Sequence, residues 1–199
     1  MALFAADTYP NLKYIVTALE ALWPEHGRFL AKRFAGCTDS HFRMAETLAS
    51  LVLRLTDGDL GELIEDYRWH CDCLAQEQMH FMRTGRYRLS SFADAAAEVY
   101  ENAHYMGRYM NALLLTQVLW GNHTEALLFY TERFLGTNPD HYHHLEIGPG
   151  HGLLLYFAAL DPRAKSIEAW DVSDASLNMT TPYYASALSG PLICAAGMS

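Results

Sequence analysis

The sequence predicts an α+α/β protein, in which an N-terminal multi-helix domain precedes the first part, a βαβ unit, of an α/β domain. In residues 1–140, apolar residues recur at helical steps of three and four. Residues 145–173 read LEIGPGHGLLLYFAALDPRAKSIEAWDVS, where a strand pattern, a glycine turn, an apolar run and a second strand pattern follow one another. The turn-forming stretch GTNPD, residues 136–140, separates the two patterns. We therefore predict a helical domain over 1–140 and a partial α/β domain over 141–199.

The helical domain is predicted to contain six helices, each ended by proline, glycine or polar residues. Helix 59–83 carries one apolar stripe along its length, and Asn122 with Glu125 forms a capping-box signature for the last helix. The predicted helices cover residues 11–23, 25–34, 40–55, 59–83, 91–120 and 122–135, and the stripe consists of Leu60, Leu63, Tyr67, Cys71, Leu74 and Phe81.

The α/β part is predicted from alternation and from breakers. Leu145 and Ile147 flank Glu146 in the first strand pattern, and an apolar run, residues 153–160, follows the glycine turn as a helix. The breaker Asp161-Pro162 separates this helix from a second strand, residues 166–170, which ends on Asp171. Residues 191–196 offer a third strand.

The turn and the acidic residue are suited to binding a nucleotide-like ligand. Gly148, Gly150 and Gly152 permit backbone torsions that are closed to other residues and let a ligand touch the main chain. The first N–H groups of the following helix lack helical partners and are expected to receive a polar ligand group. Asp171 offers two acceptor oxygens to a ribose diol.

The glycine spacing distinguishes between cofactors. A dinucleotide-binding turn would carry glycine at position 153, where Leu153 stands. The sequence from Glu146 to Gly152, EIGPGHG, instead resembles motif I of the class I (Rossmann-like, seven-stranded) S-adenosylmethionine-dependent methyltransferases, and the similarity covers residues 142–179. This resemblance implies that S-adenosyl-L-methionine is bound by Glu146, Gly148, Pro149, Gly150, Gly152, Asp171 and Val172. It also implies methyl transfer to an oxygen, nitrogen or carbon of a small-molecule or peptide-like acceptor.

Catalytic residues are not identified by any motif, and two candidates remain. His123 is a candidate general base, and Tyr109 belongs to an aromatic run that either packs in the core or lines a pocket. No metal site is expected: metal-ligand types at positions 70, 73, 77 and 80 spread over ~15 Å of one helix, too far to close round one ion.

Composition limits the partners and the compartment. A formal net charge of −9 without a long basic run argues against nucleic acid, and we expect no signal peptide, no membrane partner and a reducing cytoplasm. Few residues follow Asp171, so the strands that complete the resembled domain have no counterpart here. We therefore expect a truncated or split methyltransferase that forms a homo-oligomer, such as a dimer, or pairs with a second chain. The alternative is a non-catalytic cofactor-binding remnant or a helical interaction module.

Overall fold

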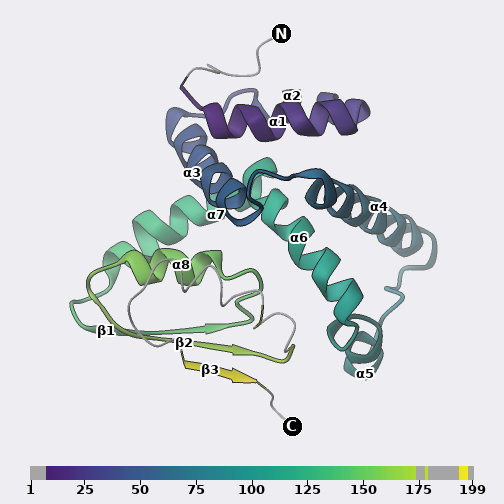
Figure 1. Ribbon diagram of the computed structural model, residues 1–199. Coiled ribbons are helices and arrows are strands. Elements are labelled where there is room, and N and C mark those ends of the chain that lie inside the picture. Colours follow the sequence, from purple (N-terminus) through teal and green to yellow (C-terminus); the bar gives the residue numbers. More distant parts are fainter. Residues whose placement is uncertain (1–7, 174–177, 179–192, 197–199) are drawn as a thin grey trace. The chain divides into compact units, whose positions relative to one another are not determined.

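The computed structural model describes residues 8–173, 178 and 193–196 (Figure 1). The chain forms two compact units, one comprising Met1–Glu65 with Leu113–Gly136, the other Asp66–Ala112 with Thr137–Ser199. We call them unit 1 and unit 2 and describe each by itself. The coarse prediction, helices followed by an α/β part, is confirmed, while the domain boundary at residue 140 stays a prediction. Among the helices described, none is long and apolar enough to cross a membrane.

Unit 1 is built from helices that bury one apolar side each. Helix α1, Pro10–Leu22, packs on α3, Asp39–Leu55, and α3 also packs on α7, Gly121–Phe129. Between α1 and α3 in the chain lies α2, Gly27–Phe34. The core of this unit includes Leu12, Ile15, Leu19, Leu48, Val52 and Leu127. Burial of these side chains supplies the main driving force for packing.

Two helices contribute residues to both units: α4, Gly61–Thr84, and α6, Ala103–Leu119. The apolar stripe predicted along α4 is buried only in its first part. Leu60, just before α4, and Leu63 and Tyr67 within it are buried, whereas Leu74 and Phe81 are exposed. The second half of α4 therefore leaves the core although its helical period continues.

The single helix predicted over residues 91–120 is also wrong, because the chain breaks there. A short helix α5, Phe92–Ala95, continues into a π-helical turn, Ala96–Tyr100. Asn102 then ends the run, and its side chain accepts a hydrogen bond from the Tyr105 N–H at 3.0 Å, so α6 begins with a side-chain cap. A π-helical turn holds one extra residue and shifts the side chains that follow it around the helix axis.

The capping box predicted at Asn122 and Glu125 is not formed. Helix α7 starts one residue earlier, with Trp120 at its N-cap and no side-chain cap bond. The chain passes almost directly from α6 into α7, and Arg33 bridges this junction. Its guanidinium donates to the Leu119 carbonyl at 3.1 Å and to the Thr124 hydroxyl at 2.9 Å.

The sheet of unit 2 is parallel. Strand β1, Tyr142–Ile147, pairs with β2, Ala164–Asp171, and β2 pairs with β3, Ile193–Ala196, in the order β1-β2-β3. Helix α8, Leu153–Leu160, joins β1 to β2 and packs on one face of the sheet (Figure 1). The strand predicted over 191–196 is thus present as β3, and residues 191 and 192 lie outside the described residues.

The two faces of the sheet differ in burial. On the α8 face, His144, Ile167 and Ala169 are buried. On the opposite face, which we call the open face, three apolar residues are exposed: Leu145 by 48%, Ile147 by 75% and Trp170 by 41%. Parallel sheets are normally covered on both faces.

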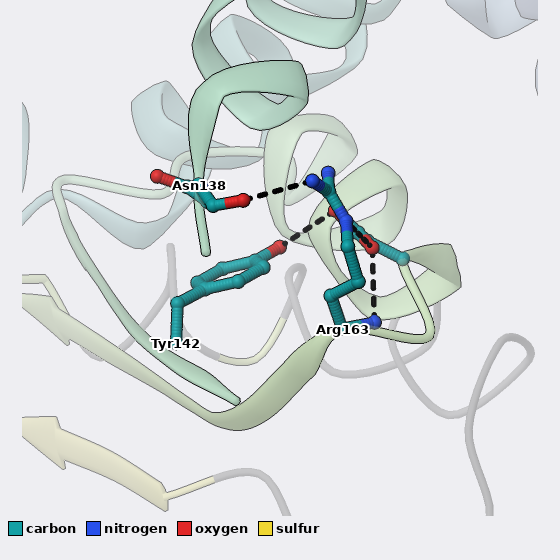
Figure 2. A network of polar contacts seen from close by, with 4 residues as sticks. Asn138, Tyr142 and Arg163 are labelled. Carbon is teal, nitrogen blue, oxygen red and sulfur yellow. Dashed lines mark hydrogen bonds and ion pairs between the residues drawn. The ribbon is translucent and has the colours of Figure 1, made fainter. Parts of the chain in front are cut away.

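The amino ends of β1 and β2 are fastened by a polar network (Figure 2). Arg163 holds the Asp161 carboxylate through its Nε at 3.0 Å and its Nη2 at 2.7 Å, and its Nη1 donates to the Asn138 carbonyl at 2.8 Å. The Tyr142 hydroxyl, from the first residue of β1, donates to Asp161 Oδ2 at 3.2 Å. These bonds, with Arg163 first, lower the pKa of Asp161 below its usual range. The network joins the entry of β1 to the turn between α8 and β2.

This network predicts a pH-dependent loss of stability in Asp161→Asn. The pKa of Asp161 is lower in the folded state than the ~3.9 of an unfolded chain, so the charged carboxylate stabilises the fold above that value. This contribution disappears as the pH falls through the lowered pKa. We expect Asp161→Asn to lower the urea midpoint at pH 7, and the difference from wild type to shrink at pH 3. Asp72→Asn, at an exposed position of α4, controls for the lost charge. A difference that is constant with pH would contradict this account.

Candidate functional site

The candidate site is built on the glycine loop, residues 148–152, which leads from β1 to α8. All three glycines have positive φ, at 71°, 57° and 79° for Gly148, Gly150 and Gly152. Residues with a Cβ rarely adopt such φ angles, so the backbone path of the loop favours glycine at these three positions. The loop closes on itself through the Gly152 N–H, which donates to the Pro149 carbonyl at 2.8 Å.

The loop begins directly beside the end of β2. The Gly148 N–H donates to the Trp170 carbonyl at 2.7 Å, which continues the β1–β2 pairing one residue past β1. Asp171, the next residue after Trp170, therefore lies next to the first glycine of the loop. One oxygen of its carboxylate accepts the Ser173 N–H at 2.9 Å, and this bond fixes the turn after the strand. The predicted pairing of glycine loop and acidic residue is thus present in unit 2.

Glu146 places a buried carboxylate at the entry of the loop. Its side chain is 12% exposed, and its Oε2 is buried without a hydrogen-bond partner. The nearest basic group is His144 Nε2 on the same strand, at 3.8 Å. A buried acceptor without a donor is costly, and such groups are concentrated at functional sites. Glu146 has the chemistry required to receive an ammonium group.

His151 changes one expectation about the helix that follows the loop. Its Nδ1 accepts the Leu153 N–H at 3.2 Å, so the first N–H group of α8 is already paired. The prediction that the first N–H groups of this helix are available to a ligand is therefore wrong for Leu153. The ligand-facing groups of the loop are the glycine main chain and the carboxylates at its two ends.

Residues from the helical part of unit 2 also reach the loop and the end of β2. A Cβ placed on Gly150 would lie 3.8 Å from Met110 Sδ, so α6 passes close to the middle of the loop. The Ser173 hydroxyl donates to the Tyr100 carbonyl at 3.2 Å, which brings the end of the π-helical turn to the end of β2. Met110 and Tyr100 both lie in the helix predicted over residues 91–120, but no local signal distinguished them from core residues.

The two catalytic candidates lie in different units. Tyr109 is in unit 2, where its ring stacks edge-to-face on His70 at 5.3 Å. Burial, and then the neighbouring Tyr100, raises the pKa of Tyr109, so its phenol stays protonated at neutral pH and is suited to donate a hydrogen bond. His123 is in unit 1, close to Gln117, and burial lowers its pKa. Both remain predictions as catalytic residues.

The metal-ligand types of α4 have other partners. His70 packs on Tyr109, and Glu77 pairs with Arg88. Burial raises the pKa of the Cys73 thiol above its usual value, which keeps this thiol protonated. Within residues 8–173, 178 and 193–196, no three His, Cys, Asp or Glu side chains are grouped so as to hold a metal ion.

Comparison with known proteins does not assign the chain to a family. The chain matches no protein-family model, no curated protein and no solved structure. The candidate site therefore rests on its own residues and geometry.

The unpaired carboxylate predicts a variant that gains stability. Glu146→Gln removes a buried charge without a donor, and we expect the free energy of unfolding of the ligand-free protein to rise by about 1 kcal/mol or more. Glu168→Gln, on the open face of β2, removes the same charge and should change stability little. Chemical denaturation of both variants tests this. A loss of stability in Glu146→Gln would show that His144 already compensates the carboxylate.

Proposed function

We propose that this chain binds S-adenosyl-L-methionine at the glycine loop and belongs to a methyltransferase. The observation that carries the proposal is the Gly148–Trp170 hydrogen bond, which places the loop beside Asp171. Glycine main chain, a buried acid at the loop entry and a second acid at the neighbouring strand end are what a ligand with an amino acid and a ribose requires.

The described residues fit the parts of this cofactor. Glu146, whose Oε2 is buried and unpaired, would receive the ammonium group. The main chain of Gly148, Pro149, Gly150 and Gly152 would approach the amino-acid portion, and Asp171 would accept from the ribose hydroxyls. Val172, exposed just after β2, would contact the base. When bound, the cofactor supplies an electrophilic methyl group on a sulfonium.

The protein's contribution to the reaction would be alignment more than acid–base chemistry. Methyl transfer is an in-line displacement, so holding the acceptor at the right distance and angle supplies much of the rate. The protonated phenol of Tyr109 would orient an acceptor through a hydrogen bond. A base is needed only for an acceptor that loses a proton. The acceptor is proposed to be a small molecule or peptide-like, and the compartment the cytoplasm.

Calorimetric titration with S-adenosylmethionine and its demethylated product tests this function. Wild type is expected to bind both. Gly150→Val should abolish binding, because a branched side chain would stand where the ligand approaches and where Met110 already lies close. Gly85→Val is the matched control: Gly85 has a φ of 69°, so it carries similar strain, and its Cβ would meet nothing within 4 Å. Binding of neither ligand by wild type would favour the non-catalytic interaction module.

We also propose that the open face is covered by a second copy or by a second chain that completes the domain. Leu145, Ile147 and Trp170 give this face an apolar surface on a parallel sheet. Burial of that surface would remove it from water at both partners.

Sedimentation velocity tests the self-association. We expect wild type to form a dimer or a larger oligomer and Ile147→Lys to shift it toward monomer. Leu160→Lys provides the control, because Leu160 on α8 is similarly exposed but lies away from the open face. A monomeric wild type would exclude a homo-oligomer and leave a separate partner chain.

A further inference from the structure

His144 and Glu146 form a buried pair on the α8 face of the sheet. The two residues are two positions apart on β1, so their side chains lie on the same face of the strand. Both side chains are almost fully buried, and His144 Nε2 lies 3.8 Å from Glu146 Oε2. This distance is too long for a hydrogen bond, and Glu146 Oε2 has no such partner in the part of the chain that the structure describes. The pair therefore interacts through charge, and only when the imidazole is protonated.

The neighbouring strand does not compensate this pair. In the β1–β2 register, His144 is opposite Ile167 and Glu146 is opposite Ala169, and both β2 residues are apolar and buried. The other titratable residues on the α8 side of β2 and on the segments next to it are Lys165, Asp171, His151 of the loop, Tyr156 of α8 and Tyr109 of α6. Of these side-chain types, only histidine ordinarily changes charge between about pH 5.5 and 8.

One buried carboxylate can compensate one cation. The proposed ligand brings an ammonium group to Glu146, and a protonated His144 would bring a second positive charge to the same oxygen atoms. A buried charge without a counter-charge is unstable, so the two cations exclude each other. Because such coupling is reciprocal, binding of the ammonium group expels the imidazole proton, and protonation of the imidazole weakens the binding.

We propose that His144 is a positioning residue that controls access of the ligand's ammonium group to Glu146. The neutral imidazole leaves the carboxylate to the ligand. The protonated imidazole forms an ion pair with the carboxylate and excludes the ammonium group. This inference rests on the proposed function, since it concerns the amino-acid end of the same ligand.

Calorimetric affinities at pH 8 and pH 5.5 test this role with two ligands. S-adenosylhomocysteine carries the ammonium group, and 5′-methylthioadenosine lacks the amino acid. Wild type is expected to bind S-adenosylhomocysteine about tenfold more weakly at pH 5.5, because a binding step that releases one proton weakens by up to about tenfold per pH unit. Its affinity for 5′-methylthioadenosine should not change. Titrations in two buffers of different ionisation enthalpy should show that S-adenosylhomocysteine releases a proton on binding at pH 5.5.

Three histidine variants assign the proton. His144→Gln keeps a polar side chain that does not titrate, so its affinity for S-adenosylhomocysteine should be the same at both pH values and close to that of wild type at pH 8. His143→Gln is the matched control, because His143 is the preceding residue of β1 and is exposed. It should retain the affinities and the pH dependence of wild type. His151→Gln should also retain the pH dependence, whatever its affinity.

The outcomes separate this inference from the proposed function. Wild-type binding of S-adenosylhomocysteine with equal affinity at both pH values would overturn the role of His144 and leave the proposed function standing. A pH dependence that persists in His144→Gln would also overturn it, because another group would then titrate. Weaker binding of both ligands by His144→Gln at pH 8 would show a structural role instead. Failure of wild type to bind either ligand would overturn the proposed function and this inference with it.

Discussion

A turn that requires left-handed backbone angles underlies the arrangement of unit 2. Gly148 leaves β1 with a φ of 71° while its N–H still pairs with β2, so the chain can reverse toward α8 without breaking the sheet pairing. A residue with a Cβ in this conformation costs roughly 1–2 kcal/mol. The position of the loop relative to Asp171 depends on this one backbone bond. Met110 of α6 lies beside Gly150, 3.8 Å from the position that a Cβ would take there.

The buried carboxylates of unit 2 differ in their hydrogen-bond partners. Asp66 is held by Arg108 at 2.6 Å and by Asn111 at 2.9 Å, and Asp161 is held by Arg163 at two atoms. Both have an arginine because a buried charge is stable only when it is paired and hydrogen-bonded. Glu146 has a histidine at 3.8 Å and an oxygen without a donor. The exception lies at the loop, where a ligand is proposed to supply the missing donor.

Helices and sheet belong to one unit at the proposed site. Residues 66–112 belong to the same unit as residues 137–199, so the Tyr100 carbonyl contacts Ser173 and Met110 lies near Gly150 although both residues precede β1 in the chain. The open face lies on the side of the sheet opposite α8. One face is covered by α8, and the other exposes Leu145, Ile147 and Trp170.

Local chemistry in the sequence determined the strands, the loop and most helices. Glycines at alternate positions, the breaker Asp161-Pro162 and the alternation of β1 act over a few residues, so the βαβ unit with Asp171 at its strand end was predictable. The apolar period of residues 91–120 runs across Asn102 and therefore did not predict that a new helix begins there. Cofactor identity was inferred from resemblance and stays a proposal.

The apolar period of the sequence does not show which apolar side chains are covered, and the tertiary structure decides this. Helical period shows which side of α4 is apolar, but whether Leu74 and Phe81 are covered depends on the neighbours that the fold provides. The hydrogen bond between Ser173 and the Tyr100 carbonyl joins residues 73 positions apart in the chain, and the isolation of Glu146 Oε2 depends on which groups the fold places around it. Such contacts arise from packing between segments, and for that physical reason no local spacing rule predicts them.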